Sequence, residues 1–140
     1  MSKTLQLTAA DLDPLGPQTR WLRRSLFFIY TALLIYGLFR PAGPSALHLF
    51  ITSDKVMHFL GFAGLAFCTR LAFTHASAWK IWSLIILCAP LSEGLQHQVE
   101  SSRQFSWLDI CANLAGVAAG ALCWWISIRL YHHYKTRQPL

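Results

Sequence analysis

The hydrophobic residues of this chain fall into four long runs, separated by short segments that are polar or rich in proline and glycine. A helix needs about 20 apolar residues to cross the roughly 30 Å hydrocarbon core of a bilayer. The runs come close to this length, and tilt or interfacial ends make up the difference. The pattern therefore predicts four membrane-spanning helices, over residues 21–39, 56–73, 79–95 and 108–131.

The connections between these runs are short, and no internal repeat separates one part of the chain from another. We therefore expect one four-span membrane domain over residues 21–131, a polar N-terminal tail over 1–20 and a basic C-terminal tail over 132–140. The semi-apolar stretch 46–51, which follows a proline- and glycine-containing break, is expected to lie along the membrane interface.

Composition supports a membrane protein. Of the 140 residues, 54% are hydrophobic and 13% are charged, whereas soluble domains carry about 25% charged residues. So short a chain with so little charge lacks the polar surface of an ordinary soluble enzyme, and it is too hydrophobic for a disordered protein. The four cysteines lie inside apolar runs without a C-x-x-C pair, so we expect neither a disulfide framework nor a cysteine metal site.

The formal net charge of +6 does not indicate a nucleic-acid partner, because the basic residues flank the apolar runs instead of forming one patch. In a membrane protein such residues set the topology. Nine Lys and Arg residues fall on the side of the predicted bundle that holds both termini, and three fall on the other side. The positive-inside rule then predicts cytoplasmic termini in a bacterial plasma membrane, with the first and third connections facing outward.

With this topology, three separate parts of the chain bring polar side chains to the outer face. Ionisable groups in membrane spans are costly and mark functional sites by default, so this convergence predicts an outward-facing polar pocket. Asp54 and His58 share one helix face, and so do Glu93 and Gln96. The predicted pocket residues are Asp54, Lys55, His58, Glu93, Gln96, Arg103, Asp109 and Asn113.

The last predicted span carries a stripe of residues at helical spacing. Asp109, Asn113, Gly116 and Gly120 recur at steps of four, three and four. The two glycines form a small-xxx-small pattern, which permits close contact between helices. We expect this stripe to pack into the bundle and carry Asp109 and Asn113 inward, and the glycines are also a candidate surface for a homo-oligomer.

The polar motifs in this order resemble those of the VanZ-like family. They are D-K-x-x-H-F at 54–59, E-x-x-Q at 93–96, R-x-x-x-x-x-D at 103–109 and N-x-x-G at 113–116. The resemblance spans residues 54–120 and implies a small bacterial multi-pass membrane protein, in a family named after a teicoplanin-resistance accessory protein. It implies an architecture more directly than a reaction.

Most of the pocket residues also have an ordinary structural interpretation. Asp54 suits the beginning of a helix, and Ser106-x-x-Asp109 is a capping-box pattern. Lys55 and Arg103 suit interfacial anchors. His58 and Asn113 suit hydrogen bonds within a bundle.

Glu93 fits a structural role least well. It lies near the end of the third predicted span, where a negative charge opposes the helix dipole, and it follows Pro90. We therefore expect a partner for Glu93, such as Lys55 or Arg103, or a bound proton.

Two functions from different classes follow from this pocket. In the first, an accessory protein binds an anionic envelope molecule: a glycopeptide antibiotic, a glycan or a lipid-linked precursor. Lys55, Arg103 and His58 would hold the phosphate or carboxylate. Asp109, Asn113 and Gln96 would bind hydroxyl or amide groups.

In the second, the protein is an intramembrane hydrolase or transferase acting on such a molecule. Glu93 or Asp54 would be the general base and His58 the acid or proton shuttle, while Lys55 and Arg103 would stabilise developing charge. A divalent ion between Asp54, Glu93 and Asp109 is a variant of this reading. Because no fixed-spacing metal motif supports it, we predict no metal and no cofactor.

Overall fold

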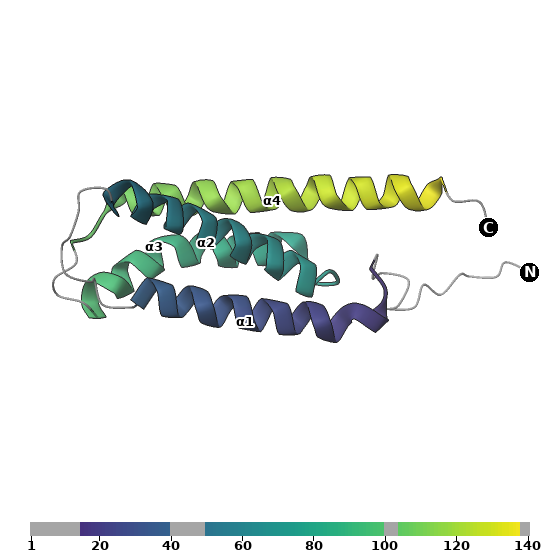
Figure 1. Ribbon diagram of the computed structural model, residues 1–140, viewed down its shortest axis with the longest axis horizontal. Coiled ribbons are helices and arrows are strands. Elements are labelled where there is room, and N and C mark those ends of the chain that lie inside the picture. The colour runs from purple at the N-terminus through teal and green to yellow at the C-terminus, as the bar shows by residue number, and fades with distance from the viewer. Residues whose placement is uncertain (1–14, 40–49, 100–103, 138–140) are drawn as a thin grey trace, which may run out of the picture.

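The chain folds into an antiparallel bundle of α-helices (Figure 1). The structure is a computed structural model, and it describes residues 15–39, 50–99 and 104–137. Within these ranges there is no β-strand, so the predicted all-α class is confirmed. The elements are a 3-10 turn η1 (Pro17–Thr19) and the helices α1 (Arg20–Phe39), α2 (Phe50–Ala72), α3 (Ala78–Val99) and α4 (Trp107–Thr136).

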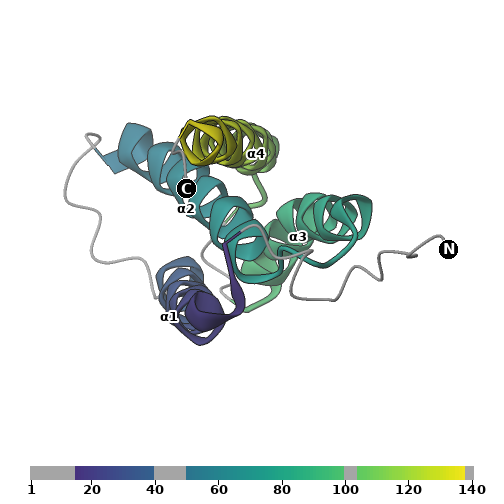
Figure 2. The same cartoon turned by 90° about the vertical axis from the view of Figure 1, so that its right-hand side faces the viewer.

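Successive helices run in opposite directions, so the beginning of α1 and the end of α4 lie at the same end of the bundle (Figure 1). The view along the bundle places α2 centrally, with α4 on one side and α1 and α3 on the other (Figure 2). α2 contacts all three other helices, and its contact with α4 is the most extensive. α2 and α4 are therefore the structural centre of the bundle.

Two glycines of α4 make this central contact possible. A Cβ atom at Gly116 would collide with the carbonyl oxygen of Phe59, and one at Gly120 with the carbonyl oxygen of Ala63. The close helix packing predicted from the small-xxx-small pattern is therefore confirmed, and its partner is α2 of the same chain. The surface through which a homo-oligomer was expected is occupied by this intramolecular contact.

In the part of the chain that the structure describes, three stretches are long and apolar enough to cross a membrane: residues 17–39, 78–99 and 107–136. α2, which corresponds to the predicted span 56–73, is not among them, because it carries Asp54, Lys55, His58 and Arg70. Its central position gives these polar residues protein neighbours. α1, in contrast, leaves large apolar side chains exposed, such as Trp21 at 77% and Phe28 at 62%.

The helices extend beyond the predicted apolar runs, because helix formation continues through polar residues outside an apolar window. α2 begins at Phe50 and α3 continues to Val99. Asp54 therefore lies inside α2 and not at its N-cap, and Glu93 is further from a helix end than expected. Of the expected interfacial stretch 46–51, residues 46–49 lie outside the described residues and 50–51 begin α2.

The end of the bundle that holds the beginning of α1 is held together by arginines. An arginine at the start of an apolar run can extend toward the membrane interface, but Arg23 is buried, with 5% of its surface exposed. Its guanidinium donates to the carbonyl oxygens of Leu71 at 3.0 Å and Gly16 at 3.1 Å. Carbonyls in the last turn of a helix lack hydrogen-bond donors within that helix. Arg23 supplies such a donor to the last turn of α2 and does not extend to the interface.

Candidate functional site

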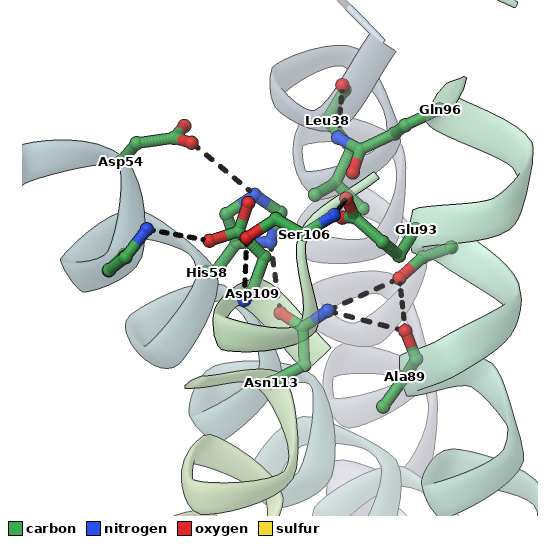
Figure 3. A network of polar contacts seen from close by, with 11 residues as sticks. Leu38, Asp54, His58, Ala89, Glu93, Gln96, Ser106, Asp109 and Asn113 are labelled. Carbon is green, nitrogen blue, oxygen red and sulfur yellow. Dashed lines mark hydrogen bonds and ion pairs between the residues drawn. The ribbon is translucent and has the colours of Figure 1, made fainter. Parts of the chain in front are cut away.

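Polar side chains are buried together at the opposite end of the bundle, where α2 and α4 begin and α3 ends (Figure 3). We call this group the polar cluster; its described members are Asp54, Lys55, His58, Glu93, Gln96, Asp109 and Asn113. Five of them are almost fully buried, with exposed fractions of 2% for His58, 2% for Glu93, 2% for Gln96, 5% for Asp109 and 0% for Asn113. Burying so many polar groups is costly unless each finds a partner, so their contacts are informative.

Glu93 of α3 binds the beginning of α4. The Ser106 backbone N–H donates to Glu93 Oε1 at 2.8 Å, and the Ser106 side chain accepts from the Asp109 N–H at 3.3 Å. In a capping box the side chain at the third helical position, here Asp109, would bind back to the N-cap N–H. Glu93 takes that role instead, so the predicted cap is confirmed at Ser106 but is completed from another helix.

The Asp109 carboxylate forms an ion pair with a lysine of another helix. Lys55 Nζ of α2 lies 3.2 Å from Asp109 Oδ1. The Asp109 side chain is only 7% exposed, whereas that of Lys55 is 36% exposed. Lys55 therefore neutralises a buried carboxylate while its ammonium group remains near the open edge of the polar cluster. Among the described residues, Lys55 pairs with Asp109 and not with Glu93, for which Lys55, Arg103 and a bound proton were the alternatives predicted from the sequence.

Asn113 is the hydrogen-bonding centre of the polar cluster. Its Nδ2 donates to the Ala89 carbonyl and the Ser92 hydroxyl, both at 3.4 Å. The amide oxygen therefore faces α2, where it lies 3.0 Å from His58 Nδ1. Since that oxygen can only accept, Nδ1 carries the proton and Nε2 faces Asp54, whose Oδ2 is 4.0 Å away. All the protein contacts of Asn113 match its structural interpretation; its predicted ligand-binding role stays a prediction.

Two buried oxygens in the polar cluster lack a donor. Gln96 Nε2 donates to the Leu38 carbonyl at 2.6 Å, but Gln96 Oε1 has no hydrogen-bond partner among the described residues. Glu93 Oε2 is likewise without a donor in the described part of the chain. An unsatisfied buried polar atom costs about 1–3 kcal/mol. These two acceptors are therefore places where a bound molecule or water gains hydrogen bonds.

The polar cluster contains every predicted pocket residue that the structure describes. Arg103 lies outside the described residues. His97, four residues after Glu93, is exposed and not part of the buried face. Ser92 and Ser106 supply contacts that position Asn113 and Glu93, and only Ser106 had a sequence signal, its capping pattern.

A set of possible metal ligands also differs from the one considered from the sequence. One ligand atom each of Asp54, His58 and Asp109 lies within 4.8 Å of the others. Glu93 is not part of this group. The variant based on Asp54, Glu93 and Asp109 is thus replaced by one in which a histidine takes the place of Glu93.

No family model, no curated protein and no solved structure matches this chain. The resemblance to the VanZ-like family therefore stays a prediction from the sequence motifs.

Proposed function

We propose that this chain is a VanZ-like integral protein of the bacterial plasma membrane, in which the polar cluster is an outward-facing site for an anionic cell-envelope molecule. Four spans with cytoplasmic termini are part of this proposal. The function is accessory: the protein binds a glycopeptide antibiotic, a glycan or a lipid-linked precursor, with membrane lipids around the bundle.

The distribution of side chains supports the membrane part of the proposal. Three helices have the length and apolarity to cross a bilayer, and they leave large apolar side chains such as Phe28, Leu84 and Leu130 more than 60% exposed. Soluble proteins rarely expose such extended apolar surface. The end of the bundle opposite the polar cluster holds Arg20, Arg23, Arg24 and Arg70, and the positive-inside rule assigns an arginine-rich end to the cytoplasm.

The observation that carries the binding proposal is the pair of acceptor oxygens without donors, Glu93 Oε2 and Gln96 Oε1. A ligand rich in hydroxyl or amide N–H groups, as glycans and glycopeptides are, would supply the missing donors. Lys55, at the more exposed edge, would meet an anionic group of the same ligand, and Arg103, which lies outside the described residues, is the second cation predicted from the sequence.

A groove between α3 and α4 favours a lipid-linked molecule within this class. It has a volume of about 270 Å³ and is lined by Trp82, Ile86, Leu114, Val117, Ala118 and Ala121. Leu114 directly follows Asn113 in α4, so the groove begins next to the polar cluster. A ligand with its polar head at the cluster would lay an acyl or isoprenoid chain along this apolar surface.

The arrangement of Asp54 and His58 keeps an intramembrane hydrolase or transferase as the second candidate. His58 Nε2 faces Asp54 Oδ2 at 4.0 Å, and the other ring nitrogen, Nδ1, is hydrogen-bonded to Asn113. A histidine oriented in this way between a carboxylate and a fixed amide is suited to transfer a proton. In this alternative Glu93 or Asp54 is the base.

The test uses purified protein in detergent and three probes: teicoplanin, a polyprenyl phosphate and a polyprenyl-diphosphate-linked disaccharide. Native mass spectrometry measures the fraction of protein bound. We expect saturable binding of at least one probe, about tenfold weaker binding in Glu93→Gln and Gln96→Met because each loses a ligand hydrogen bond, and unchanged binding in the exposed neighbour His97→Ala. Absence of binding by all three probes, or equal affinity in all variants, contradicts the proposal.

The same preparations separate the two candidate functions. If the wild type converts a probe to a product and Glu93→Gln does not, although it still binds, the protein is an enzyme. If binding occurs without turnover in the wild type, the accessory function holds.

A further inference from the structure

Asp54 and His58 of α2 and Asp109 of α4 direct polar atoms toward one another where α2 packs against α4, at the end of the bundle that holds the polar cluster (Figure 3). One ligand atom from each lies within 4.8 Å of the others. Metal–nitrogen and metal–oxygen bonds of about 2.0–2.2 Å place two ligand atoms about 3–4 Å apart. Small movements of the side chains, of which Asp54 is the most exposed at 44%, would therefore bring the three atoms to coordination distance of one ion.

The histidine of this group is oriented as metal-binding histidines are. His58 is 2% exposed, and its Nδ1–H donates to the Asn113 amide oxygen at 3.0 Å. This bond leaves the lone pair of the neutral ring on Nε2, the nitrogen that faces Asp54. A hydrogen bond to the far ring nitrogen is the usual second contact of a ligating histidine, since it fixes the tautomer and the ring plane.

The two helices that supply the ligands are also fixed relative to each other. Gly116 of α4 packs directly against the backbone of Phe59, the residue that follows His58. A site built on rigidly packed helices holds its ligands more accurately than one built on loops.

We infer that Asp54, His58 and Asp109 bind one divalent transition-metal ion, with Asn113 as the residue that orients His58. One imidazole nitrogen with two carboxylate oxygens suits Zn²⁺ or Mn²⁺, and three protein ligands leave coordination positions open for water or a ligand. Asp109 has two carboxylate oxygens, so it can retain Lys55 on one and offer the other to the ion.

This inference adds to the proposed function but does not depend on which envelope molecule is bound. Asp54 and Asp109 each bring a carboxyl group to this place, and Asp109 pairs with Lys55 through one oxygen. A divalent ion held there would add the positive charge that a phosphate or carboxylate requires.

The inference is tested with Mn²⁺ alone, without any envelope molecule. Untagged full-length protein is stripped of metal in detergent and titrated with Mn²⁺, and the loss of the free-ion electron paramagnetic resonance signal is measured. We expect one bound ion per chain, with a ¹⁴N coupling from the imidazole of His58 in the pulsed spectrum. His132 and His133, exposed near the end of α4, are further possible nitrogen ligands, so the control variant is His132→Ala with His133→Ala, which should retain both results.

Variants then assign the ligands. Asp54→Asn, at a partly exposed position, should remove saturable binding without unfolding the bundle. Asn113→Ala should weaken it about 10–100-fold, the usual effect of removing such an orienting contact. His58→Ala, if it folds, should lose the ¹⁴N coupling. Failure of the wild type to bind one Mn²⁺, binding without ¹⁴N coupling, or wild-type affinity in Asp54→Asn would each overturn the inference, while the probe experiments above would remain unaffected.

Discussion

Glu93 Oε1 accepts a hydrogen bond of 2.8 Å from the backbone N–H of Ser106 and so links the end of α3 to the first turn of α4. The two residues are separated by a connection of which residues 100–103 lie outside the described part of the chain. The bond gives this buried glutamate a structural role, because Oε1 completes the cap of α4. Oε2 has no donor among the described residues and can accept a hydrogen bond from a ligand.

Removing the Ser106 cap should destabilise the protein. Ser106→Ala loses the acceptor for the Asp109 N–H, and such a change costs about 0.5–2 kcal/mol. Thermal unfolding in detergent, followed by circular dichroism, measures the effect. Ser127→Ala, at an exposed position of α4, is the matched control and should leave the unfolding temperature unchanged. Equal behaviour of the two variants would contradict the observed cap.

The close contact of α2 and α4 predicts opposite effects for substitutions at different glycines. Gly116→Ala should destabilise the protein, because the added methyl group meets the Phe59 carbonyl and forces the two helices apart; overpacking of this kind costs about 1–3 kcal/mol. Gly37→Ala and Gly94→Ala, where nothing lies within 4 Å of the new atom, should be neutral or stabilising by up to about 1 kcal/mol.

The same thermal unfolding assay distinguishes these glycines. The packing account is contradicted if Gly116→Ala is as stable as Gly94→Ala, since both residues lie inside helices and differ in their surroundings.

The contact between His58 and Asn113 predicts coupled energetics. Asn113→Leu and His58→Leu should each destabilise the protein by about 1–3 kcal/mol, because each leaves a buried polar atom of the other residue without its partner. The double variant should cost less than the sum of the single variants by about 0.5 kcal/mol or more. Additive effects in a double-mutant cycle would show that the two side chains do not depend on each other.

Arg23 should be more important for stability than the other arginine beside it. Arg23→Met removes hydrogen bonds from a charged donor to two backbone carbonyls, a loss of about 1.5–3 kcal/mol per bond at most. Arg24→Met removes a contact of the guanidinium with the Phe73 ring at 5.8 Å and should cost about 1 kcal/mol or less. A larger effect at Arg24 would contradict the role given to Arg23.

The four helices and the gathering of polar residues at one end followed from hydrophobic run lengths and helical spacing alone. Local pattern also predicted the Ser106 cap and the buried stripe of Asp109, Asn113, Gly116 and Gly120, because each depends on residues within one helix. The helix ends were less predictable, since α2 forms through polar residues before Val56 that an apolar window does not include.

Pairing between helices could not be read from the sequence. The predicted pocket offered Lys55 three carboxylates, and its pairing with Asp109 depends on how α2 packs against α4. The place of His58 among the possible metal ligands likewise depends on the rotation of α2 against α4, which the glycine contacts set. The burial of Arg23 was also not predictable, because no local pattern reveals the carbonyls to which it donates.

The central claim is that the polar cluster opens on the outer face of a membrane-spanning bundle. It is tested most directly by single-cysteine labelling in intact cells, in a background from which the four native cysteines have been removed. Two exposed positions at opposite ends of the bundle serve as reporters, His97→Cys near the polar cluster and His132→Cys near the end of α4. A membrane-impermeant maleimide should label His97→Cys in intact cells and His132→Cys only after the membrane is permeabilised. Labelling of His132→Cys alone in intact cells, or equal labelling of both, would contradict the account.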